Sequence, residues 1–195
     1  MSNGARLWLG RGGGNRREPK PNLPLGTKIF WISRKLNSKK ILDVKIIWYK
    51  SYLKAVENSA GSNSFRNLYA RVGGKKADIL RDGILSCATF VSSILYLFKL
   101  ISDVHATVGG TVADLKKSGW IKVKKPRAGA ILVWEYRKVK NKEQYKHIGF
   151  YIGKNKAISN DSKKRQPILH HWTFGARNGR PARKVEQIFW NKKLR

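Results

Sequence analysis

Residues 86–100 read SCATFVSSILYLFKL, and apolar side chains occupy almost every side of the helix that this stretch predicts. A helix that is apolar all round is expected to lie inside a domain. Ser86 is a favourable N-cap residue, so Cys87 is expected in the first turn. Amphipathic helices are predicted before this stretch, over residues 41–57, and after it, in TVADLKKSGW at 111–120.

Strands are predicted downstream of the helices, because short apolar runs there are separated by turn residues. The runs are AILVWEY (130–136), KHIGFYIG (146–153), KAIS (156–159), QPILHHWTF (166–174) and RKVEQIFW (183–190). The glycine-broken segment 60–83 is expected to be a loop or short helical turns. Helices followed by strands predict an α+β domain, with the Cys87 helix packed on an antiparallel sheet.

Composition predicts one domain with an extension. The 195 residues are 41% hydrophobic, enough for a core, whereas residues 1–27 are rich in Gly, Pro and Arg and are expected to form a flexible basic tail. The domain is therefore predicted over residues 28–195. No run approaches the ~18 apolar residues of a membrane span, and Met1 to Arg17 lack the apolar stretch of a secretory signal. We expect a cytoplasmic protein, or one released by a non-standard route.

The charge and the cysteine count restrict the possible partners and sites. A formal net charge of +31 favours contact with nucleic acid, an anionic wall polymer or an acidic membrane surface. The basic tail is expected to add to this contact. Cys87 is the only cysteine, so an intramolecular disulfide and a Cys-rich zinc site are excluded. The four histidines lack the spacing of a metal-ligand set, and we expect neither a metal nor a cofactor.

Cys87 and His147 are the candidates for chemistry. A lone cysteine is usually a buried structural residue, but the first turn of a helix favours a thiolate and offers N–H groups to an oxyanion. We therefore expect a low pKa for the thiol of Cys87. His147 opens a strand in which Gly149 is expected to leave room for the cysteine helix, which makes His147 the predicted base. The alternative is a structural histidine in the core or on an exposed strand.

The motifs around these residues resemble the NlpC-type cell-wall peptidases, which have a papain-like fold. Ser86 to Val91 (SCATFV) resembles the family's Asp-Cys-Ser-Gly-Phe-Val nucleophile motif, and 147–153 (HIGFYIG) its His-Val-Gly-Ile-Tyr-Ile-Gly strand. The segment 69–74 (YARVGG) is similar to its Tyr-x-x-Gly-Gly segment, with one extra residue, and 126–134 (PRAGAILVW) is similar to its Pro-Gly-Asp-Leu-Val-Phe strand. The resemblance implies N-terminal helices, with the nucleophile helix packed on the sheet.

The resemblance also implies a third polar residue that orients the histidine from the next strand. The family's spacing falls on Ser159, but Asn serves in papain-like relatives, so we favour Asn160, with His170 or His171 as weaker choices. The chain departs from the family at Ser86, at Ala88-Thr89 and at Gly129-Ala130, where the family has Asp, Ser-Gly and Gly-Asp. Tyr69, His171 and Trp172 are predicted to contact substrate.

Two functions are favoured by the sequence, and a third, an acyltransferase, is left open because a thioester acyl-enzyme can pass its acyl group to an amine as well as to water. The first is a cysteine hydrolase that cleaves amide or peptide bonds, for which the resemblance implies peptidoglycan stem peptides as substrate. The second is a non-catalytic basic protein that binds nucleic acid or an anionic polymer. No zinc finger, helix-turn-helix signature or aromatic RNA-binding motif is found, which favours the hydrolase.

Overall fold

The computed structural model of the chain describes residues 44–138 and 144–194. Its helices are α1 (Trp48–Asn58), α2 (Cys87–Leu97) and α3 (Val108–Lys117). The main sheet contains β3 (Ile121–Lys122), β4 (Ile131–Lys138), β5 (Gln144–Gly153), β6 (Lys156–Asp161), β7 (Gln166–His171) and β10 (Val185–Trp190). Two short hairpins are formed by β1 (Tyr69–Val72) with β2 (Lys75–Asp78), and by β8 (Ala176–Arg177) with β9 (Arg180–Pro181).

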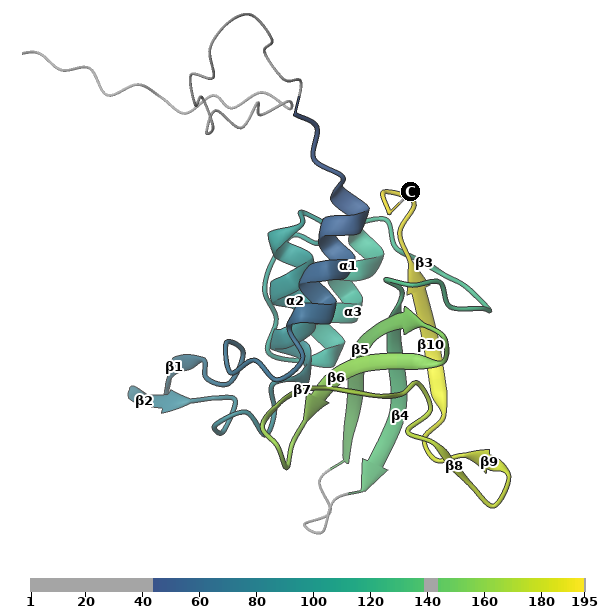
Figure 1. Cartoon of the computed structure of the whole chain (residues 1–195). Coiled ribbons are helices and arrows are strands. Elements are labelled where there is room, and N and C mark those ends of the chain that lie inside the picture. Colours follow the sequence, from purple (N-terminus) through teal and green to yellow (C-terminus); the bar gives the residue numbers. More distant parts are fainter. Residues whose placement is uncertain (1–43, 139–143, 195) are drawn as a thin grey trace, which may run out of the picture. The chain divides into compact units, whose positions relative to one another are not determined.

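The predicted α+β class is confirmed. The six strands follow the order β3-β10-β4-β5-β6-β7, and every neighbouring pair is antiparallel. The last strand, β10, returns to the sheet, as the sequence predicts, and the structure places it between β3 and β4. Figure 1 shows the three helices gathered beside this sheet, with the β1–β2 hairpin projecting away from them.

Strand alternation divides the sheet's side chains between two faces. On β5, Ile148 and Phe150 are fully buried and belong to the same apolar cluster as Phe90 and Val91 of α2. Trp134 of β4 is fully buried in a second, smaller cluster on the other face. Burying each such side chain contributes about 1.5–3 kcal/mol, so the apolar contact with β5 holds α2 against the sheet.

Several local predictions need correction. The first helix begins at Trp48, because Ile47 has a non-helical backbone (φ −86°, ψ 85°), and residues 44–47 are not helical; residues 41–43 lie outside the described residues. Ser86 precedes α2, but its hydroxyl forms no capping bond and is buried without a partner. Segment 60–83 contains the β1–β2 hairpin, where a loop was expected.

The remaining expectations about organisation concern the ends of the chain. The predicted boundary between residues 27 and 28, and the basic tail before it, lie outside the described residues. Across residues 44–138 and 144–194, no helix has the length and apolar character needed to cross a membrane.

Candidate active site

Cys87 is the first residue of α2, as predicted, and its side chain is half-buried against the main apolar cluster. The loop before it is fixed at Gly83, which has a positive φ of 88° and lies so close to Arg165 that a Cβ would sit 2.6 Å from the Arg165 carbonyl oxygen. Asp82 forms ion pairs with Arg66 and Arg165. Cys87 is therefore held in place from both sides, by this loop before it and by the buried helix after it.

The backbone of β5 faces the thiol. Tyr151 exchanges hydrogen bonds with the β4 side, accepting from Gly129 and donating to the Ala130 carbonyl. Because backbone groups alternate along an antiparallel strand, the N–H of Ile148 points to the β6 side. Pairing between β5 and β6 ends at Phe150 with Ile158. The Ile148 N–H is therefore available to the Cys87 sulfur, and it acts there to lower the thiol pKa.

The thiol is not a thiolate at rest. Burial raises the pKa of Cys87 above its ordinary value, and the N–H groups of Ile148, Ala88 and Cys87 itself offset only part of this. The positive charge of Arg183 also opposes the increase in pKa without cancelling it. The expected low thiol pKa is therefore wrong: the cost of burying a charge exceeds the effect of the helix N-terminus.

His147 projects from the face of β5 opposite Ile148, where it lies beside Trp134 with ring centroids 5.3 Å apart. Its Nε2 is 2.8 Å from the hydroxyl of Ser159 on β6, and that hydroxyl is 2.7 Å from Nε2 of His170 on β7. Within the described residues no hydrogen bond joins the Cys87 sulfur to the His147 ring. The two residues are neighbours through the His147–Ile148 peptide, and Nδ1 of His147 has no hydrogen bond there.

The imidazole of His147 is neutral at ordinary pH. Burial, followed by the positive charges of Arg183 and His170, lowers the pKa of His147 to about 3. Arg183 is itself buried and donates hydrogen bonds to the carbonyl oxygens of Glu135 and Tyr145. Cys87 and His147 are thus both uncharged at ordinary pH, and a neutral imidazole is the form that can accept a proton.

Asn160 does not orient His147. Its amide nitrogen donates a 2.7 Å hydrogen bond to the carbonyl oxygen of Gly83, in the loop before α2, and its Oδ1 is buried without a partner. The contact with His147 belongs to Ser159, the position that the family spacing indicates, and His170 follows as the next member of the chain. The preference for Asn160 is corrected: this residue fixes the loop that leads to Cys87.

Gly149 leaves room for β6 and not for the cysteine helix. A Cβ at Gly149 would lie 2.6 Å from Cβ of Ser159 and 2.7 Å from the carbonyl oxygen of Ile158. Both atoms belong to β6, so the missing side chain lets that strand approach closely enough for Ser159 to reach His147. The glycine was expected to matter for the site, but for a different reason.

The three predicted substrate contacts come from two parts of the chain, with Tyr69 in one and the adjacent residues His171 and Trp172 in the other. Tyr69 is exposed on the β1–β2 hairpin, with the Lys76 ammonium 4.8 Å from its ring centroid. His171 is exposed at the end of β7, and Trp172 packs edge-on against Tyr151. No hydrogen bond or ring contact within the described residues joins Tyr69, His171 or Trp172 to Cys87 or His147, so their role in binding substrate stays a prediction.

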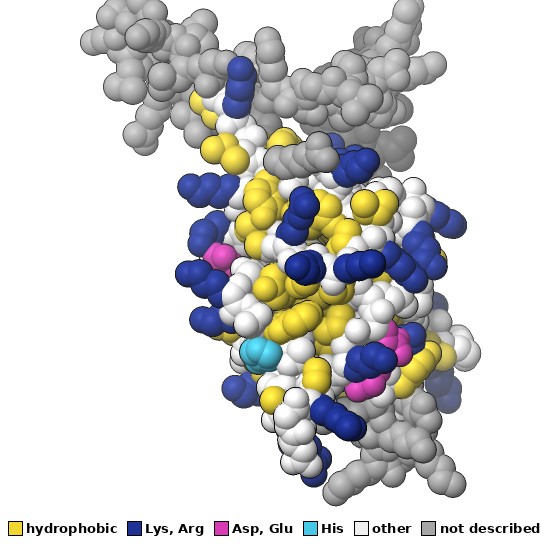
Figure 2. Space-filling view, turned by 90° about the vertical axis from the view of Figure 1, so that its right-hand side faces the viewer, with side chains coloured by type: hydrophobic (Ala, Val, Ile, Leu, Met, Phe, Trp, Pro, Cys, Tyr) yellow, Lys and Arg dark blue, Asp and Glu magenta, His cyan; other side chains and the backbone are white. Residues whose placement is uncertain are grey.

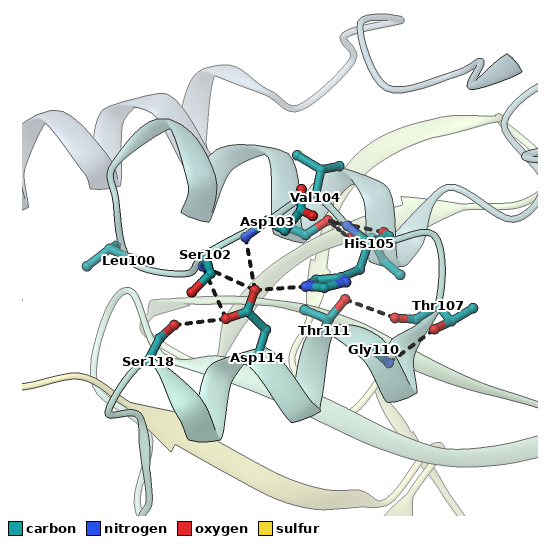
Figure 3. A network of polar contacts seen from close by, with 12 residues as sticks. Leu100, Ser102, Asp103, Val104, His105, Thr107, Gly110, Thr111, Asp114 and Ser118 are labelled. Carbon is teal, nitrogen blue, oxygen red and sulfur yellow. Dashed lines mark hydrogen bonds and ion pairs between the residues drawn. The ribbon is translucent and has the colours of Figure 1, made fainter. Parts of the chain in front are cut away.

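His105 has a structural partner. Its Nε2 lies 2.8 Å from Asp114, whose carboxylate also accepts hydrogen bonds from the N–H groups of Ser102 and Asp103 and from the Ser118 hydroxyl. Figure 3 shows Ser102, Asp103 and His105 reaching Asp114 from the loop between α2 and α3, and Ser118 reaching it from the end of α3. Burial opposes the ionisation of Asp114, but the hydrogen bonds outweigh it and lower the pKa of Asp114 to about 2. This network closes the loop and leaves His105 outside the candidate site.

Phe174 and Arg183 also lie beside these histidines, and no pattern in the sequence predicts this. Phe174 stacks on the His170 ring with centroids 4.1 Å apart, and the Arg183 guanidinium lies 5.7 Å from the Phe174 centroid. Both follow β7 in irregular or short elements, where no periodic pattern marks a residue's neighbours. The described residues contain no group of three or more His, Cys, Asp or Glu side chains able to hold a metal ion.

Comparison with known proteins adds no family. No protein-family model and no curated protein matches the chain. The resemblance to the cell-wall peptidases therefore rests on the sequence motifs alone.

Proposed function

We propose that the protein is a cysteine hydrolase that cleaves amide or peptide bonds, with Cys87 as nucleophile and His147 as general base on a papain-like arrangement. The observation that carries this proposal is the position of the Cys87 thiol, at the start of α2 and against the N–H of Ile148. The residue before Ile148 is His147, whose Nε2 is already engaged by Ser159. A structural cysteine requires neither neighbour.

The neutral resting pair defines how the reaction would begin. As the Cys87 sulfur bonds to the substrate carbonyl carbon, the thiol proton moves to Nδ1 of His147, and the carbonyl oxygen gains the negative charge. The N–H groups at the start of α2, which have no partner within the helix, can stabilise that oxyanion. His147 then gives its proton to the leaving amine as the C–N bond breaks, which leaves a thioester on Cys87.

Deacylation uses the same groups. Water attacks the thioester while His147 accepts one of its protons, and the sulfur leaves and recovers that proton. A His147 pKa of about 3 keeps the ring ready to accept protons through most of the pH range, but makes the imidazolium short-lived. Peptidoglycan stem peptides are the proposed substrate, as the family resemblance implies.

The direct test is hydrolysis of stem peptides and of fluorogenic amides by the full chain and by Cys87→Ala. The matched control is the double variant Cys87→Ala, Ser93→Cys, which keeps one thiol on the same helix in a partly exposed position. We expect hydrolysis by the wild type and none by either variant. Hydrolysis that survives in Cys87→Ala, or wild-type protein inactive on every amide tested, would end the proposal.

A basic binding protein is the second candidate, and the surface favours it. Figure 2 shows lysine and arginine side chains spread around an apolar area, with few acidic side chains among them. The net charge of +31 points the same way. The two candidates separate experimentally, because polyanion binding should persist in Cys87→Ala whereas hydrolysis should not.

A further inference from the structure

Three polar side chains form a continuous hydrogen-bonded chain that crosses the sheet from β5 to β7. It runs from His147 Nε2 to the Ser159 hydroxyl (2.8 Å), and from that hydroxyl to His170 Nε2 (2.7 Å). It ends at Nδ1 of His170, which lies 2.7 Å from the backbone carbonyl oxygen of His171. This last contact decides which group donates and which accepts in each of these hydrogen bonds.

A carbonyl oxygen only accepts hydrogen bonds, so Nδ1 of His170 must carry a proton. In neutral His170, Nε2 is then an acceptor, and the Ser159 hydroxyl must donate to it. That hydroxyl has a single proton, so it can only accept from His147, whose Nε2 must carry hydrogen. The remaining nitrogen, Nδ1 of His147, is left without a proton, which is the tautomer that a base for Cys87 requires.

We propose that His170 is a positioning residue that sets the tautomer of His147 through Ser159, and that protonation of His170 switches the site off. A protonated His170 donates from both nitrogens, so the Ser159 hydroxyl turns and donates to Nε2 of His147. The proton of neutral His147 then resides on Nδ1, where it cannot accept the thiol proton. This inference rests on the proposed hydrolase function.

The surroundings of His170 hold its ring in place. Phe174 stacks on it at 4.1 Å with an interplanar angle of 16°, and Trp134 lies 5.8 Å away. Neither ring carries a charge or offers a competing partner to Nε2. The His170 ring is thus restrained by packing in the orientation that the hydrogen-bonded chain needs.

The charged groups around His170 come from several strands. Asp161 of β6 favours protonation, whereas His171 of β7 and Arg183, which precedes β10, oppose it; His147 of β5 is the titratable group at the other end of the chain. Burial is the largest influence, and with these charges it lowers the pKa of His170 below its ordinary value. At neutral pH His170 is therefore neutral, and Nδ1 of His147 is left without a proton. Protonation of His170, which switches the site off, requires a pH below the ordinary histidine value of about 6.5.

Nitrogen-15 NMR of the full chain tests the relay directly, because the chemical shift of each ring nitrogen reports whether it carries a proton. In the wild type at pH 8 we expect His147 protonated on Nε2 and His170 on Nδ1. On acidification His147 should move to the Nδ1-protonated form. A wild-type His147 protonated on Nδ1 at pH 8 would overturn the proposal.

Two variants separate the acceptor role of His170 from its bulk. In His170→Gln the amide can donate to the His171 carbonyl and accept from Ser159. His147 should therefore keep the Nε2-protonated form at pH 8 and also after acidification. In His170→Leu the acceptor is lost, and His147 should shift toward the Nδ1-protonated form at pH 8. The matched control is His171→Gln on the same strand, which should change neither tautomer.

Hydrolysis by the same proteins distinguishes the two proposals. We expect His170→Leu to lose on the order of 10⁴-fold in kcat, the scale of a wrong histidine tautomer. His170→Gln should lose the acid limb of the pH profile. If the tautomers behave as described but the protein hydrolyses no amide, His170 controls the His147 tautomer and the proposed hydrolase function is refuted. Activity with a His147 tautomer insensitive to His170→Leu would refute the relay alone. Urea midpoints verify that each variant is folded.

Discussion

Gly149→Ala should separate β6 from β5 at the point where Ser159 meets His147. The added Cβ would lie 2.6 Å from Cβ of Ser159 and 2.7 Å from the Ile158 carbonyl oxygen, against 3.4–4 Å for ordinary contact. The strands must therefore part by about 0.8 Å. The 2.8 Å contact between His147 and Ser159 would widen to about 3.6 Å, beyond the range of a hydrogen bond.

The expected cost is that of overpacking, about 1–3 kcal/mol of folding free energy, or a fall in Tm of about 2–4 °C for each kcal/mol. Any hydrolysis should fall on the order of 10²-fold, because the base loses its fixed orientation. Thermal unfolding and nitrogen-15 NMR of His147 measure the two effects.

The control is Gly109→Ala in α3, where a Cβ would meet no atom within 4 Å and the helix should gain up to about 1 kcal/mol. If Gly149→Ala retained the wild-type Tm and the Nε2-protonated His147, the close approach of β6 would not be what orients the histidine.

Three further changes test other parts of the structure. Asp114→Asn should cost about 1–3 kcal/mol at pH 7. Because the pKa of Asp114 is lowered to about 2, the stability that its carboxylate contributes is complete above the unfolded carboxyl pKa of about 3.9 and is lost as the pH falls toward 2. The difference in urea midpoint between wild type and variant should therefore be smaller at pH 2.5 than at pH 5. An equal difference at both pH values would contradict this. Iodoacetamide should label Cys87 with a midpoint above the ~8.5 of a free thiol, because burial raises its pKa, and a midpoint below that value would show that the sulfur is not desolvated. Asn160→Ala should lower the urea midpoint by loosening the loop at Gly83, yet leave the His147 tautomer unchanged, and a tautomer shift in that variant would restore Asn160 as the orienting residue.

The sequence by itself determined the elements that depend on local pattern. The apolar run 86–100 predicts a buried helix, because such a helix tolerates apolar side chains all round, and α2 occupies Cys87–Leu97 of it. Alternation in 146–153 predicts the strand that carries His147, and the order of helices and strands predicts the α+β class. The β1–β2 hairpin was missed, because its exposed strands have no buried face and therefore no apolar alternation.

The tertiary structure decided which residues meet. Ser159 and Asn160 are adjacent in sequence and point to opposite faces of β6, so the choice between them follows from the register of β6 against β5 and from the close approach at Gly149. His170 joins them from a strand that is paired to β6 but distant from His147 in sequence. The direction of the Cys87 pKa shift could not be predicted from sequence either. A helix N-terminus is a local feature that the sequence indicates, whereas desolvation depends on every group packed around the sulfur. In this protein desolvation is the larger effect and raises the pKa.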